Sequence, residues 1–114
     1  MRDGVEITSR KSGDFDWLGI AGEVDMHASP QVRKALLAAL QPKAALLVDL
    51  SAVRYMDSSG VACLVEAFQT ARKQGSRFAL VAVAQPVLNV LRLARLDKVF
   101  TLYASLDEAL AGGG

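Results

Sequence analysis

LLVDLSAVRYMDSSG, residues 46–60, is the stretch that decides the fold. Four of its first five residues are apolar with almost no alternation, which is typical of a strand covered on both faces of a sheet. The apolar positions then change to the i, i+3, i+4, i+7 spacing of one helix face: Val61, Leu64, Val65 and Phe68. The stretch therefore predicts a buried strand at 46–50, a short polar connection, and a helix that runs from Gly60 to about Gln74.

The residues at the helix start, Asp57-Ser58-Ser59-Gly60, admit two interpretations. Short oxygen-bearing side chains accept hydrogen bonds from the unpaired N–H groups of a first helical turn, so a helix cap with no further role is the simpler one. A helix N-terminus also favours negative charge, and two adjacent serines offer hydroxyl groups that can carry a covalent phosphate. Gly60 weakens a helix but lets another backbone approach closely, which adds weight to a functional site.

Length and composition indicate one compact domain over residues 1–114. The chain has 114 residues, 52% of them hydrophobic, and a formal net charge of +1, so it has no global basic field for nucleic acid. Its single cysteine, Cys63, excludes an internal disulfide and a multi-cysteine metal site, and we expect it to be a small helix residue. No apolar run approaches the roughly 18 residues of a membrane span and no secretory leader is apparent, so we expect a cytoplasmic protein without membrane insertion.

The other predicted elements alternate between strand and helix. Strands are expected at 5–11 and 15–24, as a hairpin near a sheet edge, and again at 78–83 and 99–103. Helices are expected to start where serine or proline fits the first turn: at Ser29-Pro30, with Ser29 as the N-cap, at Pro86, and after Ser105 as a cap. The helix that begins at Gly60 is expected to end at Gly75. The order predicts an α/β fold, a mixed β-sheet with a parallel core layered with α-helices.

The helix that begins at Pro86 is apolar on nearly every side, so we expect it to be well covered. Only Asn89, Arg92 and Arg95 remain for solvent. Together with Lys98, the two arginines form either a solvated face or a basic strip for a second partner or an anionic lipid, and the solvated face is the simpler interpretation.

Catalytic and metal sites are not indicated, and no cofactor is expected. There is no G-x-S-x-G elbow, no glycine-rich phosphate loop with its lysine, and the one histidine, His27, has no second histidine or cysteine to work with. Asp25, Asp49 and Asp57 carry oxygen ligands of the kind Mg²⁺ takes. Because Asp49 lies inside a predicted strand, we do not expect the three to converge.

The chain resembles the STAS domain family of bacterial anti-sigma-factor antagonists. The resemblance covers nearly the whole chain, and the blocks that carry it are Gly22-Glu23-Val24-Asp25, Val48-Asp49-Leu50-Ser51, Met56-Asp57-Ser58-Ser59-Gly60 and residues 91–100. The resemblance implies the STAS fold. It also implies that Ser58, the serine directly after the aspartate of the D-S-[ST]-G motif, is the phosphorylated residue, and that Asp25 is the partner-binding aspartate of the G-E-[LV]-D segment.

The resemblance implies a partner switch rather than an enzyme. The unmodified protein would bind an anti-sigma factor with serine-kinase activity. Phosphorylation of Ser58 would release the anti-sigma factor, and a phosphatase would remove the phosphate and reset the switch. The expected contact residues are Asp25, Asp57, Ser58, Ser59, Gly60, Val61 and Ala62. The alternative is a STAS subunit bound to the ATPase of a lipid-transporting ABC system, which the intact modifiable serine makes less favoured. A nucleotide-binding or small-ligand STAS module is the third interpretation.

Overall fold

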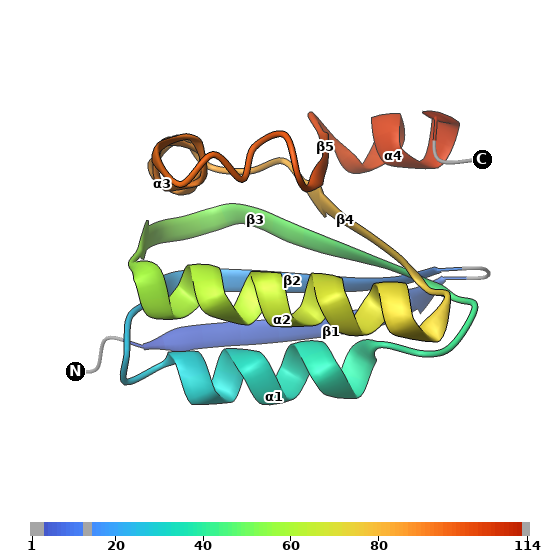
Figure 1. Cartoon of the computed structure of the whole chain (residues 1–114), viewed down its shortest axis with the longest axis horizontal. Helices are drawn as coiled ribbons and strands as arrows, with labels where there is room; N and C mark the ends of the chain where they lie inside the picture. The colour runs from blue at the N-terminus through green and yellow to red at the C-terminus, as the bar shows by residue number, and fades with distance from the viewer. Residues whose placement is uncertain (1–3, 13–14, 113–114) are drawn as a thin grey trace.

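A five-stranded sheet with helices on both sides forms the protein (Figure 1). The computed structural model describes residues 4–12 and 15–112. In chain order the elements are β1 (Val5–Ser12), β2 (Phe15–Val24), α1 (Ser29–Ala39), β3 (Ala45–Met56), α2 (Ser58–Gln74), β4 (Arg77–Val81), α3 (Gln85–Leu93), β5 (Thr101–Tyr103) and α4 (Leu106–Gly112). No helix in these described ranges is long and apolar enough to cross a membrane.

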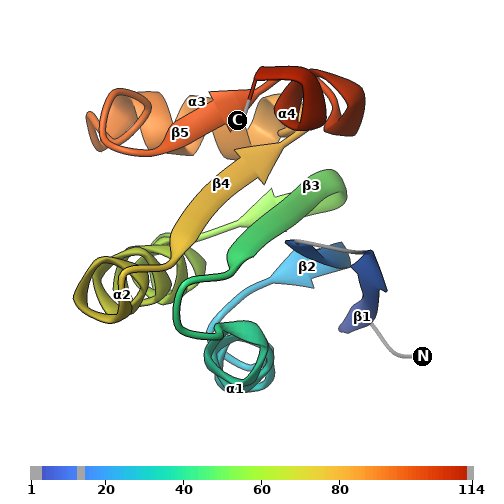
Figure 2. The same ribbon diagram turned by 90° about the vertical axis from the view of Figure 1, so that its right-hand side faces the viewer.

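The strands lie in the order β1-β2-β3-β4-β5. β1 and β2 pair antiparallel, and every following neighbour pairs in parallel, which confirms the predicted mixed sheet. Figure 2 shows α1 and α2 on one side of the sheet and α3 and α4 toward the other. Because the carboxyl ends of the parallel strands lie on the same side of the sheet, the loops after β2 and β3 meet there.

The core lies between the sheet and its helices and is built from aliphatic side chains. Val48, Leu50, Leu64 and Leu80 have no solvent exposure. At the far end of α2, Phe100 packs its ring against Phe68 and Phe78 at centroid distances of 5.5 and 6.2 Å. These contacts hold the segment before β5 against α2 and β4.

β3 is longer than predicted. It runs from Ala45 to Met56, whereas the apolar pattern indicated a strand that ends at residue 50. In the second half, Ser51 and Arg54 interrupt the apolar run, yet Val53 and Met56 are buried and the strand stays paired with the end of β2. Two register shifts in the β2–β3 ladder accompany this extension, so pairing with β2 overrides the local pattern.

Several predicted boundaries also move. α1 has Ala28 rather than Ser29 as its N-cap, and no side chain within the described residues caps the helix. α2 begins at Ser58, two residues before the predicted start, and ends as predicted at Gly75, whose φ is 74°. β4 ends at Val81 rather than residue 83, and β5 begins at residue 101 rather than 99. Ser105 caps α4 as predicted, accepting from the N–H of Glu108.

α3 is less covered than predicted. Val87 and Leu91 are buried, but Leu93 is 87% exposed at the end of the helix. Arg92 and Arg95 are exposed, as expected. A helix of nine residues with one face against β3 cannot bury an apolar residue on its outer side, whatever its composition.

Candidate functional site

The site predicted from the sequence lies where β2 and β3 end. The N–H of Asp57 donates to the carbonyl oxygen of Val24 at 3.2 Å, so the start of α2 is tied to the end of β2. Gly60 allows this approach: a Cβ there would lie 2.6 Å from Cγ of Met56 and 2.8 Å from Cγ1 of Val24. The absence of a side chain at Gly60 therefore brings the loop that contains Asp25 next to the first turn of α2.

Asp57 is the N-cap of α2, as predicted. Its Oδ1 accepts from the N–H of Ser59 at 2.9 Å and, at a long 3.4 Å, from the N–H of Gly60. The same oxygen accepts from the hydroxyl of Ser59 at 2.5 Å. One carboxylate oxygen therefore satisfies two backbone donors of the first turn and also fixes the Ser59 side chain.

These hydrogen bonds lower the pKa of the Asp57 carboxyl below its usual value. The hydroxyl of Ser59 is the largest cause; burial, the second largest, acts in the opposite direction, and the N–H groups of Ser59 and Gly60 lower the pKa further. Hydrogen bonds to an ionised carboxylate favour the charged form. The start of α2 therefore carries a fixed negative charge at neutral pH.

Ser58 differs from Ser59 in both exposure and bonding. Ser58 is the first residue of α2 and is exposed, whereas Ser59 is half-buried. Within the described part of the chain, the hydroxyl of Ser58 has no hydrogen-bond partner, whereas that of Ser59 donates to Asp57. The two neighbours thus offer an enzyme very different hydroxyl groups.

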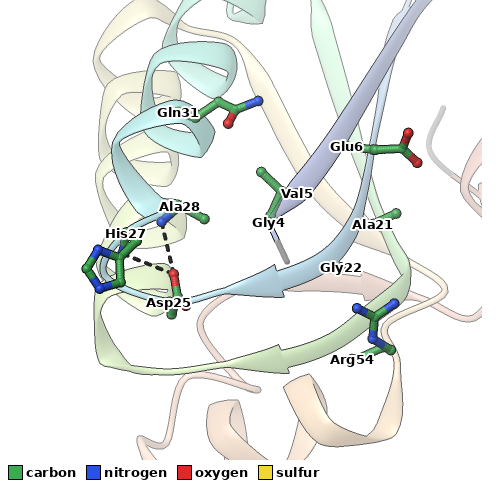
Figure 3. Close-up of a pocket in the computed structure, with 10 residues that line it drawn as sticks. All are labelled: Gly4, Val5, Glu6, Ala21, Gly22, Asp25, His27, Ala28, Gln31 and Arg54. Carbon is green, nitrogen blue, oxygen red and sulfur yellow. Dashed lines mark hydrogen bonds between the residues drawn. The ribbon is translucent and has the colours of Figure 1, made fainter. Parts of the chain in front are cut away.

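Asp25 lies on the loop after β2 and organises that loop. Its Oδ1 accepts from the N–H groups of His27 and Ala28, both at 3.0 Å, as Figure 3 shows. Oδ1 is engaged by backbone N–H groups, which holds the carboxylate in place on the loop. His27 is exposed beside it, in keeping with the expected ordinary loop residue.

The loop borders an open depression of ≈ 940 Å³. In Figure 3, Asp25 and His27 stand on one side of it, with Glu6 and Arg54 on the other. Arg54 also lies 3.9 Å from a carboxylate oxygen of Glu23. The depression therefore mixes both signs of charge at an open surface and has no enclosed apolar floor of the kind that holds small ligands.

Only part of the predicted contact set is at the surface. Ser58 and Ala62 are exposed and Ser59 is half-buried, while Gly60 is buried and Val61 is 9% exposed. Gly60 instead lies against Val24 of β2 and Met56 of β3, and Val61 belongs to the hydrophobic core. The exposed surface of this turn is therefore formed by Ser58 and Ala62, with Asp25 and Asp57 half-buried beside it.

Two large apolar side chains near the site escaped the sequence reasoning. Met26 is 69% exposed directly after Asp25, and Tyr55 is 49% exposed two residues before Asp57. Met26 lies in the loop after β2 and Tyr55 near the end of β3, and the apolar pattern does not show that either is exposed, so only the structure identifies these two as surface residues. Exposed side chains of this type commonly anchor protein–protein contacts.

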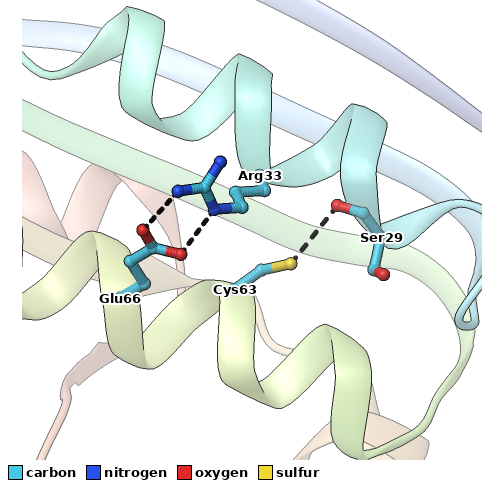
Figure 4. A network of polar contacts seen from close by, with 4 residues as sticks. All are labelled: Ser29, Arg33, Cys63 and Glu66. Carbon is cyan, nitrogen blue, oxygen red and sulfur yellow. Dashed lines mark hydrogen bonds and ion pairs between the residues drawn. The ribbon is translucent and has the colours of Figure 1, made fainter.

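Cys63 belongs to the packing between α1 and α2 rather than to the site. Its Sγ lies 3.3 Å from the carbonyl oxygen of Ser29, and burial raises the pKa of its thiol (Figure 4). One turn away, Arg33 forms a bidentate pair with Glu66, with N–O distances of 2.6 and 2.7 Å. The pair joins the two helices at their solvent side.

The three aspartates considered for a cation do not form a site. Oδ1 of Asp49 accepts from the N–H and the hydroxyl of Ser51, while Oδ1 of Asp25 and Oδ1 of Asp57 accept from backbone N–H groups of two other segments. Among the residues that the structure describes, no group of three or more histidine, cysteine or carboxylate side chains is placed to hold a metal ion.

Comparison with known proteins gives consistent matches. A family model described as STAS domain matches residues 6–109. The anti-sigma-F factor antagonist RsfB of Mycobacterium tuberculosis is 32% identical, covering 96% of this chain and 90% of that protein. The anti-sigma-B factor antagonist of Bacillus subtilis is 29% identical, covering 90% and 94%. A crystal structure of an anti-sigma factor antagonist from Mycobacterium paratuberculosis superposes with a TM-score of 0.85 at 29% identity, covering 95% and 92%.

Proposed function

This chain belongs to the STAS domain family, and from that premise we propose that it is an anti-sigma-factor antagonist controlled through the hydroxyl of Ser58. The similar proteins named above are antagonists of anti-sigma factors. Such antagonists are regulators that act by binding. The partner of this chain is accordingly an anti-sigma factor. A role in sigma-factor control places the chain in the cytoplasm.

One observation supports Ser58 as the switch residue. Ser58 is an exposed residue whose hydroxyl has no hydrogen-bond partner within the described structure, while the adjacent hydroxyl of Ser59 donates to Asp57. A kinase needs a hydroxyl that can enter its active site and lose its proton, which Ser58 offers and Ser59 does not. The kinase is the anti-sigma factor itself, and a separate phosphatase reverses the modification.

The effect of a phosphate at Ser58 follows from the charges around it. A phosphoserine carries about −1.5 to −2 charges at neutral pH. The N–H groups of Ser59 and Gly60, which a phosphate at a helix start ordinarily uses, are already taken by the carboxylate of Asp57. The phosphate therefore stays at the surface next to the negative charges of Asp57 and Asp25, where a partner that fitted a neutral hydroxyl is repelled.

The fold is not expected to change in this switch. The start of α2 is held by the cap of Asp57, by the bond from Asp57 N–H to Val24 and by the packing of Gly60. None of these contacts uses the Ser58 side chain. Release of the partner is thus a local electrostatic event at a preformed surface.

The experiment is a phosphorylation assay with the anti-sigma factors of the source organism. Each purified candidate is incubated with ATP and the wild-type chain, and the modified residue is located by peptide mass mapping. Modification confined to Ser58, with none in Ser58→Ala and full modification in Ser59→Ala, is the expected result. Modification of Ser59 or of a distant serine in the wild-type chain would refute the assignment.

A binding measurement without ATP separates the partner from the modification. The wild-type chain and Ser58→Ala are expected to bind the same anti-sigma factor equally well. If an affinity capture with Ser58→Ala instead returns a transporter ATPase, and no anti-sigma factor binds the purified chain, the role of an ABC-transporter subunit replaces the one proposed here.

A further inference from the structure

β1 is a long strand with a free edge. It has eight residues, contains no proline, and pairs with β2 in one unbroken register from Val5–Gly22 to Ser12–Phe15. It is the first strand of the sheet, and in Figure 2 no described element lies beyond it. The opposite edge, β5, has only three residues. Regular edges of this length present backbone N–H and C=O groups that can pair with a further strand.

The backbone groups that point outward can be identified. The N–H of Glu23 donates to the carbonyl oxygen of Gly4 at 3.3 Å, so Gly4 and Glu23 are a hydrogen-bonded pair. In an antiparallel ladder such pairs alternate with non-hydrogen-bonded pairs. The even-numbered residues of β1 therefore bond to β2, and the odd-numbered ones direct their N–H and C=O groups to the free edge: Val5, Ile7, Ser9 and Lys11.

The side chains of β1 are self-complementary in one register. Val5 and Ile7 pack toward the core, while Glu6, Thr8 and Arg10 are exposed. If β1 pairs antiparallel with β1 of a second copy around Thr8, Glu6 of each copy lies opposite Arg10 of the other. Ile7 then lies opposite Ser9, which is the odd-to-odd pairing that the outward hydrogen-bonding groups require. Centring the pair on Ile7 or on Ser9 separates Glu6 from Arg10.

Neither charge has an ion-pair partner in its own chain within the described residues. Arg10 lies over the ring of Trp17, 5.3 Å from its centroid, which holds the guanidinium above the sheet and leaves its donors free. Non-hydrogen-bonded pairs bring Cα atoms to about 4.5 Å, so the side chains of Glu6 and Arg10 are within reach across such an edge.

We propose that two copies of this chain associate through β1, antiparallel and centred on Thr8, to form a continuous ten-stranded sheet across a twofold axis. Each interface has two Glu6–Arg10 pairs, and the outward N–H and C=O groups of Val5, Ile7, Ser9 and Lys11 are paired. The association uses the long edge of both copies and leaves only the two short β5 edges, so it stops at a dimer.

The first test is sedimentation velocity of the full chain over the widest concentration range that its solubility allows. The expected result is a monomer–dimer equilibrium that weakens at high ionic strength, because the two ion pairs are exposed. Amide hydrogen exchange gives the register. The N–H groups of Ile7 and Ser9 are expected to gain protection with concentration, while those of Glu6 and Thr8 are protected in monomer and dimer alike.

Charge reversal tests the pairing directly. Glu6→Arg and Arg10→Glu each place like charges opposite one another twice, and each is expected to weaken dimerisation by about tenfold or more. The double variant Glu6→Arg/Arg10→Glu restores opposite charges and is expected to restore the dimer. Lys11→Glu is the matched control, since it changes the charge on the same strand by the same amount but lies opposite Val5.

The outcomes of these measurements decide whether two copies of the chain associate through β1. A chain that stays monomeric at its highest concentration overturns it, and so does a dimer that tolerates both single reversals or that the double variant fails to restore. An equal effect of Lys11→Glu overturns the register. Circular dichroism confirms that each variant folds, which is expected because all three side chains are exposed.

Discussion

The carboxylate of Asp57 and the hydroxyl of Ser59 are joined by a 2.5 Å hydrogen bond in the first turn of α2. This bond makes two chemically equivalent neighbours unequal. Ser59 becomes part of the helix cap, and Ser58 is left exposed with its hydroxyl free in the described structure. The local geometry of one cap thus separates a structural serine from the proposed regulatory one.

Removing the cap is expected to destabilise the protein measurably. In Asp57→Ala, the N–H groups of Ser59 and Gly60 lose their acceptor, and the loss of an N-cap typically costs about 1 kcal/mol. Urea denaturation of the variant and the wild type measures the difference. Asp57→Asn is the control, because an asparagine side chain still caps a helix, and it should retain most of the stability. Equal stability of Asp57→Ala and wild type would show that the cap makes no net contribution.

Stability is expected to fall with acidification partly because of Asp57. Its pKa in the folded state lies below the usual value of 3.8, so the folded protein binds the proton less readily than the unfolded chain. The resulting stabilisation is fully present above pH 3.8 and is lost as the pH falls through the lower folded value. The pKa of Glu66 is lowered as well, by Arg33, and acts with the same sign.

Comparing the wild type with Asp57→Asn isolates the Asp57 contribution. The difference in unfolding free energy between the two should be constant near neutral pH and shrink below pH 3.8. A difference that grows on acidification would mean that the folded state raises the pKa of Asp57, contrary to the geometry.

Charge at position 58 is expected to control binding of the anti-sigma factor. Ser58→Glu places a carboxylate beside Asp57 and should weaken binding, and a loss of about 3 kcal/mol corresponds to roughly a hundredfold in Kd. Ser58→Ala should bind as the wild type does, because the Ser58 side chain that it removes makes no hydrogen bond in the described structure. Calorimetric titration of the three proteins gives the ratio, with Gln69→Glu, at an exposed position of α2 outside the predicted contact set, as the control for added negative charge.

Gly60→Ala is expected to destabilise the fold although alanine is the better helix former. Helix propensity alone favours alanine by up to about 1 kcal/mol. A Cβ would, however, meet Met56 at 2.6 Å and the backbone oxygen of Val24 at 3.1 Å, and overpacking of this kind typically costs about 1–3 kcal/mol. Thermal unfolding measures the net effect. An increase in Tm would show that the ends of β2 and β3 shift at little cost.

Much of the fold could be predicted from local patterns. The strand-to-helix change of period around residues 46–74, the αL glycine at Gly75 and the hairpin of β1 and β2 follow from the spacing of apolar residues and from backbone preferences. The cap at Asp57 follows in the same way. These features depend on residues close in sequence, so the sequence carries their full physical cause.

Other features were decided by contacts between segments far apart in the chain. β3 continues to Met56 because β2 supplies its partners, and Leu93 is exposed because α3 has only one face against the sheet. Ser29 is not the N-cap of α1, because the turn after β2 makes Ala28 the N-cap, with the N–H of Ala28 bonded to the Asp25 carboxylate. Apolar pattern alone does not encode these relations.

For the site, the sequence by itself determined the chemistry and the tertiary structure determined its presentation. Residues 57–60 specify a capped helix start with two serines, because capping needs only neighbouring atoms. That Gly60 and Val61 are packed inside while Met26 and Tyr55 are exposed depends on how the end of β2 closes against α2. The physical reason is that burial is a property of packed elements, and only the assembled sheet and helices set it.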